Sequence, residues 1–287
     1  MAGLSALPAA APLDDELVNG LRRLKLRRIR QLAPELCITA RTQRWRPEEF
    51  LRVLVTEECA ARDQSNRELR LRTAAFPVVK TLDDFDLSAS TVSRDTFDYL
   101  SSLEWISTHR NVALVGPPGT GKSHLSVALG RAAVEAGFRV RFFRADLLVE
   151  ALYRGLADNS VGRVIDGVLR RSDLVIVDEL GFSPLDSIAA NHLFRLVATA
   201  YETRSLVITS NWPFEQWTNF LPDATSATAI LDRFLHHADV VVLSGESYRL
   251  REARSHPQHT QRSGQSDPPR RPVRGLAPPP HPSPEED

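Results

Sequence analysis

Short apolar runs alternate with helical patterns from about residue 110 onward. The runs lie at residues 112–115, 139–143, 173–177, 205–209 and 240–243. Apolar runs of this length, separated by segments with helical periodicity, are typical of the strand–helix units that build parallel sheets. The pattern therefore predicts an α/β fold in which helices flank a parallel five-stranded sheet.

Helical periodicity also governs residues 14–75, which predict a small all-helical domain in front of the sheet. Leu17, Leu21 and Leu24 recur at helical spacing, and a second helix is expected to bury the face that carries Phe50, Leu51, Leu54 and Val55. Pro47 suits the first turn of a helix, where a missing N–H is tolerated. Pro34, in contrast, predicts a kink or a break after Ala33.

Composition marks the remaining boundaries. Nine of the 19 prolines lie between Pro257 and Pro284, in a stretch with few large apolar side chains that is typical of disorder. Acidic and small residues dominate 76–94 and indicate a connector. We therefore expect a disordered N-terminus at 1–13, a helical domain at 14–75, a connector at 76–94, an α/β domain at 95–254 and a disordered proline-rich tail at 255–287.

The net charge of zero conceals an uneven distribution. Residues 20–75 carry 14 basic against 7 acidic side chains, whereas residues 76–255 carry 18 basic against 22 acidic. A basic helical block is thus joined to a mildly acidic body. No apolar stretch approaches the roughly 20 residues of a membrane span, and the N-terminus lacks the basic start of a secretory signal, so we expect no membrane partner and a cytoplasmic location.

One segment carries a phosphate-binding pattern, GxxxxGK[ST], between the predicted strand at 112–115 and a predicted helix ending near residue 135. With the residue after it, the segment comprises Gly116, Pro117, Pro118, Gly119, Thr120, Gly121, Lys122, Ser123 and His124. Its glycines allow successive backbone amides to wrap phosphates, Lys122 would reach the outer phosphates, and the Ser123 hydroxyl would bind Mg²⁺. ATP and Mg²⁺ are therefore the predicted ligands, and a chance glycine-rich turn is the alternative.

Two adjacent carboxylates follow the buried run at 173–177. Asp178 and Glu179 emerge where that strand ends, at the edge of a parallel sheet where ligands bind. Asp178 is the predicted Mg²⁺ ligand, and Glu179 is placed to orient and deprotonate an attacking water. This pair favours hydrolysis, although a solvated pair at a strand end remains an alternative.

Two further polar residues fit an ATPase. Asn211 follows the strand at 205–209 and could hydrogen-bond the γ-phosphate or the attacking water, or simply cap the turn before Pro213. Arg233 lies on an amphipathic segment and could reach the γ-phosphate of a neighbouring subunit. A surface ion pair with Asp232 or Glu246 explains Arg233 equally well from local sequence.

These motifs resemble a known family, the IstB-like ATP-binding helper proteins of bacterial insertion sequences. This family is related to the DnaC helicase loader within the AAA+ ATPases. The resemblance spans most of residues 20–253. It rests on these segments, in family order: WRPEEFLRVLVTEECAARD, KTLDDFDL, GPPGTGKSHL, LVIVDELGFSPLD, ITSNWPFEQW and ILDRFLHHADVVVLSGESYRLRE. Phe182-Ser183 replaces the more usual Tyr-Leu pair, a departure that leaves the catalytic positions unchanged.

The resemblance implies a P-loop AAA+ fold and a role in transposition. Proteins of this family use ATP to assemble on DNA as oligomers and to stimulate a partner transposase. By resemblance, Asn211 is the sensor, Arg233 the finger arginine and Arg249 a second phosphate-sensing arginine, all completing a catalytic set with Lys122 and Glu179. A cytoplasmic, nucleoid-associated ATPase follows as the expectation.

The basic helices are the predicted contact to duplex DNA. The arginines that would meet phosphates are Arg22, Arg23, Arg27, Arg28, Arg30, Arg41, Arg44, Arg62, Arg67, Arg70 and Arg72. Phosphate contacts carry little sequence specificity. A solvated helical face balanced by nearby glutamates, or a surface that docks the transposase, would use the same residues.

Three other functions stay open at this point. A replicative helicase loader shares the ATP-binding motifs, a small-molecule kinase shares the phosphate loop, and an ATP-gated DNA-binding adaptor would not need Glu179. The pair His236-His237 has no thiol or carboxylate at ligand spacing in the sequence, which favours a structural surface pair over a zinc site.

Overall fold

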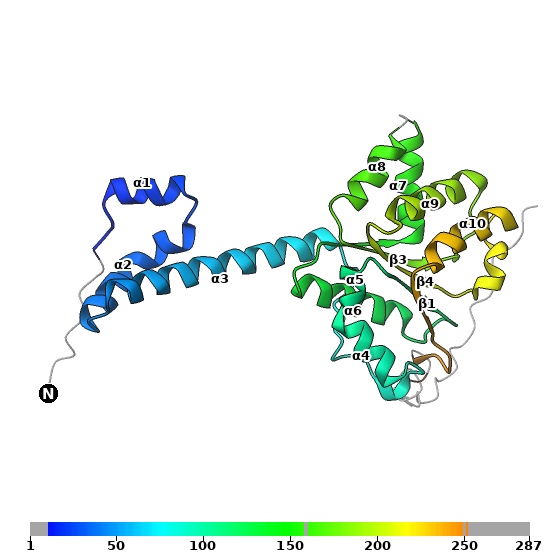
Figure 1. Ribbon diagram of the computed structural model, residues 1–287, viewed down its shortest axis with the longest axis horizontal. Helices are drawn as coiled ribbons and strands as arrows, with labels where there is room; N and C mark the ends of the chain where they lie inside the picture. Colours follow the sequence, from blue (N-terminus) through cyan, green and yellow to red (C-terminus); the bar gives the residue numbers. More distant parts are fainter. Residues whose placement is uncertain (1–10, 158–159, 249–250, 252–287) are drawn as a thin grey trace, which may run out of the picture.

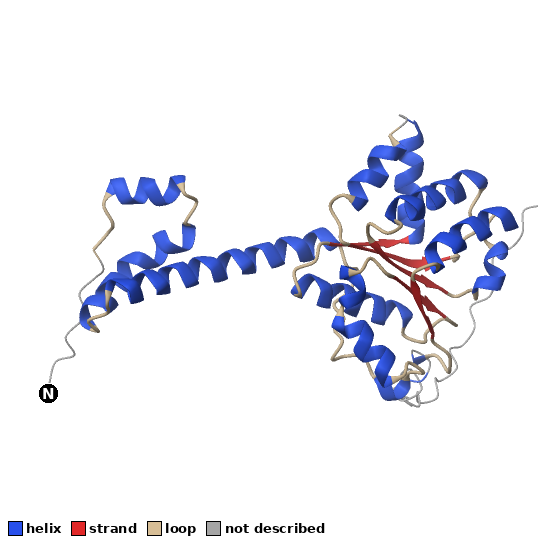
Figure 2. Ribbon diagram, viewed as in Figure 1, coloured by secondary structure: helices blue, strands red, loops and turns tan. Residues whose placement is uncertain are grey.

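Helices surround a single sheet, and a long helix projects from it (Figures 1 and 2). The structure is a computed structural model that describes residues 11–157, 160–248 and 251. The strands are β1 (Asn111–Val115), β2 (Val140–Arg144), β3 (Leu174–Leu180), β4 (Ser205–Ser210) and β5 (Ala238–Val242). The helices are α1 (Asp15–Arg23), α2 (Arg27–Thr42), α3 (Pro47–Ala74), α4 (Arg94–Ser102), α5 (Glu104–Ser107), α6 (Lys122–Glu135), α7 (Ala145–Ala157), α8 (Val161–Leu169), α9 (Ser187–Ala200) and α10 (Ala224–Leu235), with the 3-10 helices η1 (Leu87–Ala89) and η2 (Phe214–Asn219).

The five strands form one parallel sheet in the order β2-β3-β4-β1-β5. The predicted α/β fold with a parallel five-stranded sheet, flanking helices and a helical N-terminal segment is therefore confirmed. Because β4 lies between β1 and β3, the phosphate loop after β1 and the carboxylates of β3 are separated by the end of β4. The residues at the carboxyl end of β4 therefore lie between the phosphate loop and the carboxylates of β3.

Along the three inner strands β1, β3 and β4, side chains alternate between the two faces of the sheet, and helices bury both faces. Val112 and Leu114 of β1 pack under α4, α5 and α6, whereas Ala113 and Val115 belong to the core under α7, α8, α9 and α10. Figure 1 shows these two groups of helices on opposite sides of the sheet. This burial on two faces explains why the strands read as continuous apolar runs.

α3 joins the sheet to the N-terminal helices. At 28 residues it extends about 42 Å. Its far half carries α2, and its last turn buries Ala74 beside β2 (Figure 1). Arg67 of α3 forms an ion pair with Glu135 at the end of α6, with Nη1 and Oε2 3.0 Å apart. The helices α1, α2 and α3, which together form the helical arm, are thus attached to the helix that begins at the phosphate loop.

Two local predictions about these helices differ from the structure. Of the kink or break predicted at Pro34, the break does not occur: α2 runs through this proline, because the packing of α2 on α3, which buries Ala33, offsets the one hydrogen bond that proline removes. Leu51 and Val55 are 61% and 47% exposed, because α2 covers only the stripe of α3 centred on Leu54. Both side chains lie roughly 60–100° around the helix from that stripe.

Arginines and other polar side chains cover much of the remaining surface of these helices. Among the described residues, none of the helices is both long enough and apolar enough to cross a lipid bilayer.

A buried carboxylate ties α2 to α3. Oε2 of Glu58 accepts hydrogen bonds from the backbone amides of Arg28 (2.8 Å) and Ile29 (3.0 Å), and Oε1 accepts one from Nε of Arg62 (3.0 Å). The first amides of α2 lack a side-chain cap from Leu26, so Glu58 supplies that cap from another helix. Burial acts to raise the pKa of Glu58, but these hydrogen bonds outweigh it and lower the pKa below the ordinary 4.5.

We expect Glu58→Gln to lower the free energy of unfolding of the helical arm by about 1–3 kcal/mol, because one cap and one ion pair are lost. The contribution of Glu58 is fully present above pH 4.5 and is lost as the pH falls through its lowered folded-state pKa. Urea unfolding followed by circular dichroism at several pH values measures this loss. Glu68→Gln, an exposed change on the same helix, is the control, and equal stability of the two variants would contradict the capping role.

Candidate functional site

The phosphate loop lies where β1 ends and α6 begins, at the carboxyl edge of the sheet. Gly116 and Gly119 have φ values of 147° and 82°, in the region that favours glycine. A Cβ atom at Gly116 would collide with the carbonyl oxygen of Leu243, and one at Gly119 with the side chain of Ser247. The segment after β5 therefore crosses directly over the loop, and the Tyr248 amide donates to the Gly119 carbonyl at 2.9 Å.

The start of α6 is suited to bind an anion. Its N-cap residue, Gly121, has no side chain to satisfy the first amides of the helix. Lys122 is buried, and its Nζ donates to the carbonyl oxygens of Gly116 (2.6 Å) and Pro117 (2.7 Å). The loop thus brings the Lys122 ammonium group close to the uncapped amides of α6, a combination that fits the phosphates of a nucleotide.

A hydrogen-bonded cluster centres on Asp178, whose residue is only 5% exposed. Its Oδ1 accepts from the Ser123 hydroxyl at 3.0 Å and from the Thr209 hydroxyl at 2.6 Å. Thr209 in turn accepts from the Glu179 amide at 2.9 Å. The sequence-predicted Mg²⁺ ligands, Ser123 and Asp178, are therefore brought together from α6 and β3, and their oxygens are the donor type that Mg²⁺ prefers.

Glu179 departs from the strand beside this cluster. Its φ is 63°, a left-handed conformation that costs a residue with a Cβ about 1–2 kcal/mol. The pairing of β3 with β4 is irregular between Val177 and Leu180, and the Thr209 hydroxyl holds the Glu179 amide within that irregularity. The result is a half-exposed carboxylate turned away from the buried strand, accessible to water.

Sequence reasoning missed Arg144, the last residue of β2. Its Nε lies 3.9 Å from Oε2 of Glu179, and its Nη2 donates to Oδ2 of Asp146 at 2.7 Å. These three side chains line a cavity of about 170 Å³ with Phe182 and Leu185. The signal was available, because Arg144 directly follows the predicted strand at 139–143, but only the sheet order makes β2 the neighbour of β3.

β4 contributes Thr209 to the cluster, and Asn211 lies two residues beyond it. Asn211 is half-buried and follows the strand end, where Ser210 binds the Leu180 carbonyl through its hydroxyl at 2.9 Å. The role of Asn211 stays a prediction. The role of Thr209 was not predicted, because threonine is common in strands and nothing in the local sequence distinguishes this one from an ordinary strand residue.

Arg233 lies at the opposite edge of the sheet from the phosphate loop. Asn111, at the start of β1, donates through Nδ2 to the carbonyl of Phe234 at 2.8 Å, whereas Gly116 follows the end of the same strand. The length of β1, about 16 Å, therefore separates Arg233 from its own phosphate loop. Its guanidinium stacks over the ring of Phe194, 4.7 Å from the centroid.

The other predicted nucleotide-binding residues divide into two groups. Pro117 and Pro118 are exposed and Thr120 is half-buried on the loop. His124, in contrast, turns toward the connector, with Nε2 3.3 Å from the Thr81 carbonyl and its ring edge on Phe85. Burial lowers the pKa of His124. The predicted second sensor, Arg249, lies outside the described residues.

The predicted DNA-contacting arginines lie along α1, α2 and α3. Three of them form ion pairs within the chain: Arg28 with Glu57, Arg62 with Glu58 and Arg67 with Glu135. The exposed members of the set are Arg22, Arg23, Arg27, Arg41, Arg44, Arg62 and Arg72, and the half-buried ones are Arg28, Arg30, Arg67 and Arg70. Part of the basic face is therefore neutralised by glutamates, and the rest faces solvent.

Comparison with known families gives one match that covers most of the chain. The model of the IstB-like ATP binding protein family matches residues 19–256. An ATP-binding protein of insertion sequence IS21 from Pseudomonas aeruginosa is 38% identical over 240 residues, which cover 83% of this chain and 90% of that protein. The corresponding protein of insertion sequence IS5376 from Geobacillus stearothermophilus is 35% identical over 207 residues, covering 72% and 82%.

Solved structures with a similar arrangement are more distant in sequence. The DnaC helicase loader is 19% identical, with a TM-score of 0.47 over 57% of this chain and 96% of that one. DnaA from Aquifex aeolicus, bound to AMPPCP, is 21% identical, with a TM-score of 0.49 over 61% of this chain and 54% of that one.

We expect Thr209→Val to reduce, by about tenfold, the factor by which Mg²⁺ increases the affinity for ATP. The reason is that Asp178 loses one hydrogen bond and the Glu179 amide loses its acceptor. Titration with a fluorescent ATP analogue, with and without Mg²⁺, measures this effect. Thr228→Val removes an exposed hydroxyl of α10 that bonds only the Ala224 carbonyl, and this control should bind as wild type does. An unchanged Mg²⁺ dependence in Thr209→Val would show that the cluster has no part in ligand binding.

Proposed function

This chain belongs to the IstB-like ATP-binding proteins of insertion sequences, and on that premise we propose that it is an oligomeric ATPase of transposition. It binds ATP and Mg²⁺ at the phosphate loop, hydrolyses ATP, assembles on duplex DNA and stimulates a partner transposase. The cytoplasm, in association with the nucleoid, is the location that fits these partners. Each of these activities goes beyond the family assignment.

The observation that carries the hydrolytic function is the hydrogen-bonded cluster of Ser123, Asp178 and Thr209 beside Glu179. Lys122 and the α6 amides would hold the β- and γ-phosphates, and Ser123 with Asp178 would hold Mg²⁺. A bound Mg²⁺ supplies neutralisation of the charge on the phosphate oxygens. Glu179 lies at the exposed side of the cluster, where its carboxylate can orient a water molecule and accept its proton.

Arg144 adds a control over that carboxylate. Nε of Arg144 lies 3.9 Å from the Glu179 carboxylate. At this distance the guanidinium competes with water for interaction with the carboxylate. Asp146, 2.7 Å from the same guanidinium, competes for it. We therefore assign Arg144 a positioning role for Glu179.

The position of Arg233 supports assembly. Because about 16 Å of β1 separates it from its own phosphate loop, Arg233 is useful to catalysis only if it serves the site of a neighbouring subunit. Such a contact is heterologous, so successive subunits extend as a ring or a filament. Duplex DNA is a suitable support for such an assembly, with the basic helices of each subunit facing its phosphates.

Membership in the insertion-sequence family supports the remaining partner. A transposase is the enzyme on which an insertion sequence depends for movement, and within the described residues we find no set of carboxylates for two-metal cleavage of DNA. A regulatory role beside a separate transposase is the function consistent with both facts.

We expect a mixture of Lys122→Ala and Arg233→Ala subunits to recover ATP turnover that neither variant has alone. At equal mixing about a quarter of the subunit contacts combine an intact loop with an intact arginine. Steady-state phosphate release across mixing ratios measures this recovery. Lys122→Ala mixed with the double variant Lys122→Ala/Arg233→Ala is the matched control and should stay inactive. No recovery at any ratio would contradict a shared site.

We expect DNA affinity to fall steeply with salt and to be insensitive to sequence, because binding through phosphates releases counterions. Replacing both Arg23 and Arg27 by Ala should reduce the slope of log K against log salt by about one unit per arginine. Fluorescence anisotropy with two unrelated duplexes, in the ATP-bound Glu179→Gln protein, measures the slope. Arg163→Ala, an exposed arginine of α8, is the control, and a slope shared by all variants would exclude the arm as the DNA contact.

A further inference from the structure

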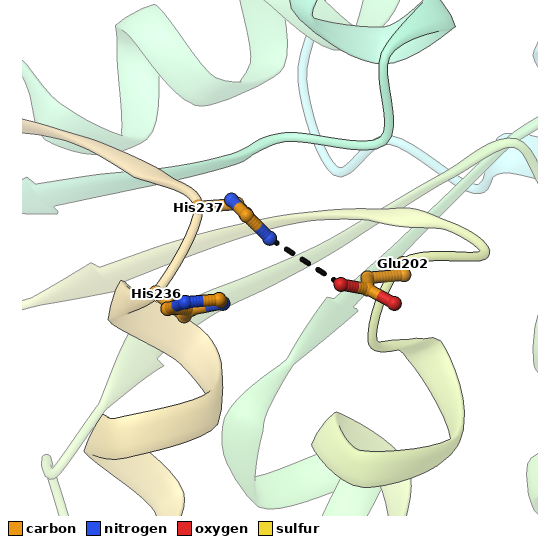
Figure 3. A group of neighbouring side chains, drawn as sticks. All are labelled: Glu202, His236 and His237. Carbon is orange, nitrogen blue, oxygen red and sulfur yellow. Dashed lines mark ion pairs between the residues drawn. The ribbon is translucent and has the colours of Figure 1, made fainter.

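Two helices end at the same place on the surface, and each brings potential metal ligands there. α9 ends at Ala200 and is followed by Glu202, whereas α10 ends at Leu235 and is followed by His236 and His237. Figure 3 shows the Glu202 carboxylate directed toward the two imidazoles. One ligand atom from each of the three residues lies within 4.8 Å of the other two. The carboxylate that the local sequence around the histidine pair lacks is thus supplied from 34 residues upstream by the fold.

We infer that Glu202, His236 and His237 form a binding site for a divalent transition metal, with zinc as the representative ion. Imidazole nitrogen and carboxylate oxygen are zinc ligands, and two such ligands about 2.0–2.2 Å from a tetrahedral ion are about 3.4 Å apart. Nε2 of His237 and Oε1 of Glu202 are 3.4 Å apart. The pair therefore already has the separation that tetrahedral zinc requires, and His236 supplies the third ligand.

The surrounding groups favour a cation at this point. Both helices direct their carboxyl-terminal ends, the negative ends of their dipoles, toward the cluster. Asp232 adds a negative charge near Tyr201, and Arg233 is the opposing positive charge, held over Phe194. Glu202 and His236 are exposed and His237 is half-buried, so a solvent water molecule would be the fourth ligand.

Tyr201 orients one of the ligands. Its hydroxyl oxygen lies 2.6 Å from Nδ1 of His236, and its ring stacks on both imidazoles with centroids 5.8 and 6.0 Å away. When Nδ1–H donates to the phenol oxygen, the lone pair of Nε2 is left for the metal. Hydrogen bonding of the second ring nitrogen is the usual way in which a histidine ligand is fixed.

The backbone around the cluster is also fixed. Glu202 has a φ of 56°, in a turn closed by hydrogen bonds from the Thr203 and Arg204 amides to the Ala200 carbonyl. The His237 carbonyl accepts from the Asn111 amide at 2.8 Å, which anchors this end of the cluster to β1. With the backbone held in this way, only rotations of the three side chains are needed to complete the site.

The test is zinc binding by the full-length protein without nucleotide, so its outcome is independent of ATP hydrolysis and DNA binding. Isothermal titration with Zn²⁺ and metal analysis after dialysis give affinity and stoichiometry. Glu202→Gln and His237→Asn should each lose one zinc equivalent relative to wild type, and Tyr201→Phe should keep the stoichiometry but bind about 10- to 100-fold more weakly. Co²⁺ should give the absorption bands of a tetrahedral N/O site in wild type but not in Glu202→Gln or His237→Asn.

His109→Asn is the matched control, because His109 is exposed, lies outside the cluster and has a φ of 54° that asparagine tolerates. It should bind zinc as wild type does. Zinc should raise the melting temperature of wild type and of His109→Asn but not of Glu202→Gln. Equal zinc binding by wild type and both ligand variants, or none by wild type, would overturn the site and leave His237 and Glu202 as an ion pair only.

Discussion

The buried carboxylate of Asp178 is the interaction on which the site depends. A carboxylate removed from water costs several kcal/mol unless hydrogen bonds compensate it. Here the compensation comes from the hydroxyls of Ser123 and Thr209, which belong to α6 and β4. One oxygen atom thus fixes the relative positions of the phosphate loop, β3 and β4. A ligand that binds Ser123 or Asp178 therefore acts on the phosphate loop, β3 and β4 together.

The order of the sheet determines what stands around this carboxylate. With β4 between β1 and β3, Thr209 bridges Asp178 to the Glu179 amide, and the strained Glu179 conformation is held from the neighbouring strand. With β2 on the other side of β3, Arg144 comes opposite Asp178 in register and reaches the Glu179 carboxylate. The two flanking strands therefore act on the same pair of acids from opposite sides.

α6 and α3 connect this site to the basic helices. α6 begins at Lys122 and ends at Glu135, which is paired with Arg67 of α3, and the N-terminal half of α3 carries Glu58, the cap of α2. Besides this partly exposed ion pair, of a kind worth about 0.2–1 kcal/mol, α3 is held by the burial of Ala74 in the same apolar core as Leu125 and Leu129 of α6.

The sequence by itself determined the five strands, the phosphate loop and the acids that follow β3, because each depends on local periodicity or on a motif within one strand–helix unit. It failed where partners come from distant segments. The cap on α2 from Glu58, the exposed sides of Leu51 and Val55, and the roles of Thr209 and Arg144 all follow from which elements become neighbours. The same holds for Glu202, which meets His236 and His237 only because α9 and α10 end together. Those neighbours are decided by packing and sheet order, since the energies that fix them act between residues far apart in the chain.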